Sequence, residues 1–123
     1  MTLKHLNTQK DILETLPLLN KIPLIDISTE TMLARALLGE YGIMVNLDND
    51  MLSGVLVYKN NFPEFFIVGV YAKNQVKEMF PLVIEELREQ NYTSIKAVTR
   101  LTQKAYEKVT GFKKLWSVYG RKI

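Results

Sequence analysis

One stretch of the sequence limits the fold more than any other. Residues Phe65 to Ala72 (FFIVGVYA) form a nearly continuous apolar run, which is typical of a strand covered on both faces. A long amphipathic helix is predicted from Gln75 to Gln90, because apolar residues recur there at helical spacing. A second buried strand is predicted from Ser94 to Val98. A strand, a helix and a strand in this order predict a parallel pair joined by a right-handed crossover.

The N-terminal part predicts a short strand and two helices. Leu3 to Leu6 is the expected strand. Thr8 is a suitable N-cap for a helix running to about Asn20, which Pro17 should end or kink. The second helix is predicted from Glu30 to Leu38, where apolar residues again mark one face.

The middle of the chain predicts two hairpin-linked strands before the apolar run. Tyr41 to Leu47 and Ser53 to Tyr58 are the expected strands, and Asp48 to Asp50 is a polar turn between them. Asn60 and Asn61 predict the next turn. Strands joined by such short turns should pair antiparallel.

The last third predicts a helix from Thr102 to Val109 and one closing strand from Leu115 to Ile123. The whole order is β-α-α-β-β-β-α-β-α-β. This order predicts a single domain over residues 1–123. Its fold class is α/β, with a mixed (α+β) sheet and helices on the faces of the sheet.

Several kinds of site are excluded or disfavoured by composition. The chain has no Cys, which excludes disulfides, thiolate zinc sites and cysteine nucleophiles. His5 is the only His, so no His pair can bind a metal, and we expect His5 to be structural or to face solvent. The formal net charge of +3 identifies no partner. Basic residues gather near the end of the chain, where a solvated surface is favoured over a site for an acidic ligand.

Membrane and nucleic-acid partners are not expected. The longest apolar runs, such as Phe65 to Val70, are too short to span a bilayer. The first residues lack the apolar segment of a signal peptide, so we expect a cytoplasmic protein. Trp116 and Tyr119 lie among Lys and Arg residues and could stack on a base, but a core or interface role is favoured.

The order of elements resembles the fold of the GNAT N-acetyltransferase superfamily over essentially the whole chain. Two local motifs support the resemblance. The sequence from Tyr106 to Lys108 (YEK), followed by Gly111 and Phe112, is similar to a signature near the end of family members. The stretch from Ser53 to Val57 (SGVLV) is similar to the family's central strand.

The resemblance implies transfer of an acetyl group from acetyl-CoA to an amine on a small molecule or a protein. It implies Tyr106 as the general acid for the departing thiolate, and Glu64 is our candidate for the general base. It also implies cofactor contacts from two groups. The backbone of the cofactor strand would come from Val70, Tyr71 and Ala72, and the phosphates would meet Gln75, Val76 and Lys77. The alternatives are a half-buried aromatic for Tyr106, a core or edge aromatic for Tyr71, and an ordinary solvated helix start for Gln75 and Lys77.

The sequence departs from the family's pattern where the phosphates would bind. Glu78 and Phe80 stand at two glycine positions, where they would place a negative charge and bulk near the cofactor. Pro81 suits only the first turn of a helix, which would make the helix start later. One extra residue also separates Tyr106 from Gly111.

Two functions follow from these observations. The first is an acetyl-CoA-dependent N-acetyltransferase. The second is a catalytically inactive GNAT-fold binding or structural protein, for example a phage virion component, which would then be located in the virion. The single closing strand predicts an exposed sheet edge, and such an edge favours a homodimer or a larger assembly.

Overall fold

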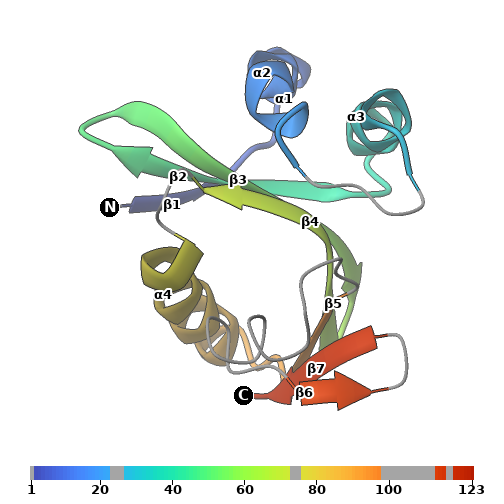
Figure 1. Cartoon of the computed structure of the whole chain (residues 1–123), viewed down its shortest axis with the longest axis vertical. Helices are drawn as coiled ribbons and strands as arrows, with labels where there is room; N and C mark the ends of the chain where they lie inside the picture. Colours follow the sequence, from blue (N-terminus) through green and yellow to red (C-terminus); the bar gives the residue numbers. More distant parts are fainter. Residues whose placement is uncertain (1, 23–26, 73–75, 98–112, 116–117) are drawn as a thin grey trace.

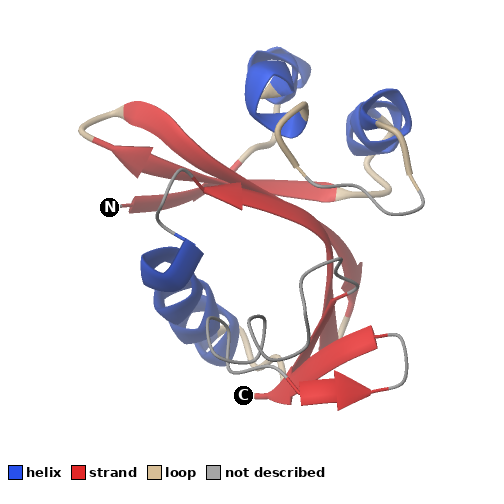
Figure 2. Cartoon of the chain, viewed as in Figure 1, coloured by secondary structure: helices blue, strands red, loops and turns tan. Residues whose placement is uncertain are grey.

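The computed structural model describes residues 2–22, 27–72, 76–97, 113–115 and 118–123. They form a seven-stranded mixed sheet with strand order β1-β2-β3-β4-β5-β7-β6 (Figures 1 and 2). The strands are β1 (Thr2–His5), β2 (Gly42–Asp48), β3 (Met51–Asn61), β4 (Glu64–Ala72), β5 (Ser94–Ala97), β6 (Lys113–Leu115) and β7 (Val118–Lys122). The helices are α1 (Gln9–Glu14), α2 (Leu16–Leu19), α3 (Thr29–Leu37) and α4 (Val76–Glu89).

Strands β4 and β5 are the parallel pair of the sheet. Their register runs from Glu64 opposite Ser94 to Ile67 opposite Ala97, and α4 connects them. The other described neighbours in the sheet pair antiparallel. The predicted strand–helix–strand unit and the predicted mixed sheet are therefore confirmed.

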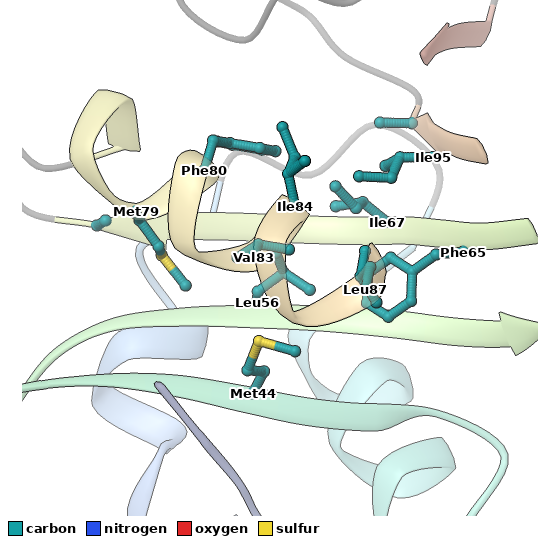
Figure 3. Close-up of a cluster of buried hydrophobic side chains, with 12 residues drawn as sticks. Met44, Leu56, Phe65, Ile67, Met79, Phe80, Val83, Ile84, Leu87 and Ile95 are labelled. Atoms are coloured by element: carbon teal, nitrogen blue, oxygen red, sulfur yellow. The ribbon is translucent and has the colours of Figure 1, made fainter. Parts of the chain in front are cut away.

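Helices cover both faces of the sheet. Figure 1 shows α1, α2 and α3 on one face and α4 on the other. Each face has its own buried cluster, and β4 contributes to both: Ile67 packs on the α4 side, whereas Val68 packs on the side of α1, α2 and α3. The apolar run is covered on both faces, as its composition predicts. On the α4 side, Met79, Val83 and Leu87 lie against the sheet (Figure 3).

The local signals in the N-terminal half act as expected. The side chain of Thr8 caps α1 by accepting from the backbone N–H of Asp11. The helical stretch breaks at Thr15, and Pro17 lies in the first turn of α2, where its missing N–H costs no hydrogen bond. Between β2 and β3, Asn49 and Asp50 both have positive φ angles, of 51° and 64°. Such angles are typical of a tight hairpin turn.

Three expectations about element boundaries are wrong. Asn60 and Asn61 belong to β3, and the turn lies at Phe62 and Pro63. The side chain of Asn60 stabilises that turn by accepting from the N–H of Phe62 at 3.2 Å. The second error concerns Pro81, which does not lie in the first turn of its helix: α4 (Val76–Glu89) agrees with the predicted range of Gln75 to Gln90 and holds Pro81 in its interior.

The early start of α4 has a physical reason. Met79 and Phe80 lie in its first turns and are almost fully buried, so packing anchors this end of the helix. Pro81 is exposed. It has no N–H to donate to the carbonyl of Lys77, which is also an exposed residue.

The third error concerns the end of the chain. The predicted closing strand is two strands, β6 and β7, and β7 lies between β5 and β6. The C-terminal strand therefore lies inside the sheet, and β6 is the outermost described strand on this side. The predicted helix from Thr102 to Val109 falls outside the described residues.

Candidate functional site

The end of β4 is the first part of the candidate site. Val70, Tyr71 and Ala72 are held on one side by β3, where they lie opposite Leu56, Val55 and Gly54. All three lie beyond Ile67 on β4. Ile67 pairs with Ala97 of β5, and this is the last pair between the two strands that the structure describes.

The side chains of these three residues belong to different faces of the sheet. Val70 and Ala72 pack with the α4 cluster, whereas Tyr71 packs on the opposite face. The ammonium of Lys21 lies 5.4 Å from the centre of the Tyr71 ring, a cation–π contact. Tyr71 is half-buried, so part of its ring remains accessible.

The start of α4 is the second part of the site. Gln75 lies outside the described residues, and Val76 is the first residue of the helix. Lys77 and Glu78 follow, and both are exposed. The first turn of a helix carries N–H groups without intrahelical acceptors and a partial positive charge, which together favour anions. Lys77 adds to this positive potential and Glu78 opposes it.

Phe80 does not obstruct the start of the helix in the way its bulk suggests. Its side chain is 2% exposed and belongs to the buried cluster formed by α4 and strand residues (Figure 3). The same cluster holds Met79 and Val83. Of the two residues at glycine positions, only Glu78 therefore presents its side chain to solvent.

Glu64 lies at the other end of β4. Its carboxylate accepts from the ammonium of Lys96 at 2.6 Å, and its backbone pairs with Ser94. At the usual rise of a strand, Glu64 is roughly 26 Å along β4 from Ala72. The structure thus brings Val70, Tyr71, Ala72, Val76 and Lys77 to one end of the sheet and leaves Glu64 at the other. Tyr106 lies outside the described residues.

Three polar side chains form a hydrogen-bonded network that the sequence did not predict. His5 Nδ1 lies 3.1 Å from the hydroxyl of Tyr58, and His5 Nε2 lies 2.8 Å from a carboxylate oxygen of Glu86. His5 therefore has a structural role, one of the two that we expected. The three residues come from β1, β3 and α4, which are far apart in the sequence, so no local sequence pattern could have indicated this network.

Burial changes the acidity of Tyr58 in this network. Burial raises the pKa of Tyr58 above its ordinary value, and the nearby Tyr92 and Glu86 raise it further. The phenol therefore stays protonated at neutral pH. Gly42 makes room for it: a Cβ at Gly42 would lie 2.2 Å from Cζ of Tyr58. The geometry fits a structural link between β1 and α4, and it does not create a nucleophile.

Other kinds of site find no support in the described part of the chain. No group of three or more His, Asp or Glu residues there could hold a metal ion. None of the described helices has the length and apolar character needed to cross a membrane.

Several solved structures that are similar to this chain are described as acetyltransferases. The ribosomal-protein-S18-alanine N-acetyltransferase of Escherichia coli is 14% identical with a TM-score of 0.77, and the match covers 99% of this chain and 93% of that one. A GNAT-family protein of Desulfovibrio desulfuricans is 10% identical with a TM-score of 0.72, and the match covers 98% of each chain. The PaiA N-acetyltransferase of Thermoplasma acidophilum, solved in complex with coenzyme A, is 12% identical with a TM-score of 0.63 and full coverage of both chains.

These similarities establish the fold. Neither the known family models nor the curated protein sequences gave a match to this chain. The chain has the GNAT fold, as its order of elements predicts.

Proposed function

Because the chain has the GNAT fold, we propose that it is an acetyl-CoA-dependent N-acetyltransferase-like protein that transfers an acetyl group to an amine. The observation that carries this proposal is the way β4 ends. The strand continues to Ala72, past its last described pair with β5 at Ile67, and α4 begins soon afterwards at Val76. A strand end followed closely by a helix N-terminus is an arrangement that can bind a pyrophosphate.

The described residues fit acetyl-CoA in most respects. The backbone of Val70, Tyr71 and Ala72 forms the end of β4, and Lys77 is an exposed cation in the first turn of α4. Phe80 is buried in the core, so its own side chain does not cover that turn. Among the described residues of that turn, Glu78 opposes an anion, and it makes the expected affinity lower than an uncharged residue would allow.

The residues of the chain can be assigned roles in this reaction. Acetyl-CoA, when bound, supplies a thioester that an amine can attack. Because alternate residues of β4 direct their backbone N–H groups away from β3, an N–H group among Val70, Tyr71 and Ala72 would stabilise negative charge on the carbonyl oxygen. The start of α4 with Lys77 would hold the phosphates. We propose Tyr106 as the proton donor to the departing thiolate. The acceptor is an amine on a small molecule or a protein.

Glu64 is a weak candidate for the base. It is ion-paired with Lys96 and lies at the end of β4 remote from Ala72. The proposal therefore assigns the binding residues and the proton donor, and it does not depend on Glu64.

Thermal unfolding with acetyl-CoA tests the proposal. A ligand that binds only the folded state raises the melting temperature, and at 100 times its Kd it adds about 2.7 kcal/mol of stability. We expect a rise that increases with the concentration of acetyl-CoA. Adenosine without phosphates is the control and should give no rise. Absence of a shift at millimolar acetyl-CoA would exclude the enzyme.

One observation favours a second function. Glu78 places an exposed carboxylate in the turn that should receive the phosphates. An inactive GNAT-fold protein that serves as a structural or protein-binding module, such as a virion component, has no need of that turn. A protein that shows no acetyl-CoA shift but binds other chains would support this second function.

A further inference from the structure

The turn that follows α2 holds a lysine in a fixed position. The N–H of Lys21 donates to the carbonyl of Leu18 at 3.0 Å. The N–H of Ile22 donates to the carbonyl of Leu19 at 3.2 Å. The side chains of Leu19 and Ile22 are buried in the cluster that α1, α2 and α3 form with the sheet. Packing on both sides therefore fixes the backbone of Lys21, whose own side chain is exposed.

This turn lies close to β4 because of Gly69. A Cβ at Gly69 would lie 2.6 Å from Cγ2 of Ile22 and 3.7 Å from Sδ of Met32, so a side chain there would push Ile22 away from the strand. Two residues further along β4, the ring of Tyr71 lies 5.4 Å from the ammonium of Lys21. The attraction between a cation and the face of an aromatic ring holds this ammonium at the end of β4.

The pair of Lys21 and Tyr71 lies on the face of the sheet opposite α4. Tyr71 packs in the cluster of α1, α2 and α3, and Figure 1 shows these helices and α4 on opposite faces. In the proposed function, the phosphates of acetyl-CoA lie at the start of α4, and the backbone around Tyr71 meets the thioester. The amine must approach the thioester from a side that the cofactor does not occupy. The side of Lys21 meets this requirement.

We propose that Lys21, held over the ring of Tyr71, selects an acceptor amine that carries an anionic group, a carboxylate or a phosphate, close to the amine. The ammonium attracts such a group and repels a second positive charge. In the transfer, the amine nitrogen forms a bond to the acetyl carbon and the C–S bond of the thioester breaks. The nitrogen loses one proton and the departing thiolate gains one. This inference rests on the proposed function, because it names the class of acceptor for the same reaction.

Acetylation of matched amines tests the proposal. The small-molecule pair is γ-aminobutyrate and agmatine, which each carry one amine and end in a carboxylate or a guanidinium. The peptide pair begins with Ala-Glu-Glu or Ala-Arg-Arg. We expect kcat/KM to be about 3- to 10-fold higher for the anionic member of at least one pair, because an exposed ion pair contributes modestly and repulsion in the cationic member adds to the difference. The pair that shows the preference distinguishes a small molecule from a peptide as acceptor.

Charge reversal at Lys21 makes the test specific. Lys21→Glu should invert the preference, and Lys21→Met should bring the two rates of each pair within about twofold of each other. Lys59→Glu is the matched control, since it makes the same change of net charge on an exposed residue of β3. Lys59 lies roughly 13 Å along β3 from Val55, the partner of Tyr71, so the preference should persist.

The ring of Tyr71 acts as a positioning group for the ammonium of Lys21. Tyr71→Leu should weaken the preference for anionic amines, because the ammonium loses the ring that holds it. Tyr71→Phe keeps an aromatic face and should retain the ratio of the two rates. A ratio that falls equally in both variants would show that the cation–π contact does not position Lys21.

Binding of acetyl-CoA separates failure of this inference from failure of the proposed function. Lys21 lies on the face opposite α4, so the rise in melting temperature with acetyl-CoA should be the same in the wild type and in Lys21→Glu. A normal rise without acetylation of either anionic probe would overturn the proposed acceptor class alone. Equal rates within both pairs, or a preference that survives in Lys21→Glu, would also overturn it. Absence of any rise in the wild type would overturn the proposed function and this inference together.

Discussion

His5 Nε2 lies 2.8 Å from Oε1 of Glu86, so the first strand of the chain is hydrogen-bonded to a helix 81 positions away in the sequence. The other ring nitrogen of His5 contacts Tyr58 on β3. The imidazole thus joins the edge of the sheet to the helix that covers it. This helix also begins at the candidate cofactor site, so its position matters for the proposed function.

We predict that His5→Ala lowers the free energy of unfolding by about 1–2 kcal/mol, because two partly buried hydrogen bonds are lost. A double-mutant cycle with Glu86→Ala should show a coupling of about 1 kcal/mol. Urea unfolding followed by circular dichroism measures both quantities. Glu85→Ala is the control: its side chain is exposed, and the change should stay within about 0.5 kcal/mol. Additive effects of the two His5 and Glu86 changes would refute the link.

The raised pKa of Tyr58 predicts how the stability of the folded protein changes at alkaline pH. Its pKa is raised in the folded protein, so the folded state holds the phenol proton more tightly than the unfolded state does. This contribution to stability is complete below about pH 10, the ordinary phenol pKa, and is lost as the pH rises through the higher folded value. Urea midpoints measured across this alkaline range should fall, and the fall should be shallower in Tyr58→Phe. Equal slopes for the two proteins would contradict the prediction.

Gly42 should tolerate no side chain while Tyr58 keeps its position. A Cβ there would lie 2.2 Å from Cζ and 2.5 Å from the hydroxyl oxygen of Tyr58. We expect Gly42→Ala to cost about 1–3 kcal/mol of stability, the usual range for overpacking. Adding Tyr58→Leu, which removes the clashing atoms, should make the Ala substitution much less harmful. Thermal unfolding of the two single variants and the double variant measures this, and a strictly additive double variant would show that the clash is not the cause.

Glu78 is expected to weaken acetyl-CoA binding. We predict that Glu78→Gln raises the affinity by about 2- to 5-fold, because an exposed charge near a helix N-terminus contributes roughly 0.3–1 kcal/mol. Lys77→Gln should lower the affinity by a similar factor. Calorimetric titration measures both. Glu89→Gln, at the far end of α4, is the matched control and should have no effect. Equal affinities for all four proteins would place the phosphates elsewhere.

The candidate site was predictable only in part. The sequence indicated the end of the FFIVGVYA strand and the start of the following helix, and the structure places Val70, Tyr71, Ala72, Val76 and Lys77 together at that end of the sheet. Sequence alone could not show that Phe80 turns into the core or that Glu64 is ion-paired with Lys96. Both facts depend on which side chains of distant segments meet, and a motif does not encode that.

Features set by neighbouring residues were determined by the sequence itself. The cap at Thr8, the hairpin turn at Asn49 and Asp50, and the apolar face of α4 follow from local backbone geometry and from the period of apolar residues. Such signals act within a few residues, so they survive in almost any fold that the chain adopts.

Tertiary structure decided the rest. It placed β7 between β5 and β6, kept Pro81 inside α4, and brought His5, Tyr58 and Glu86 into contact. These outcomes depend on packing between segments far apart in the chain, where burial of apolar surface outweighs local preference. A proline that disfavours a helix interior is tolerated there because Met79 and Phe80 fix the turn before it in the core.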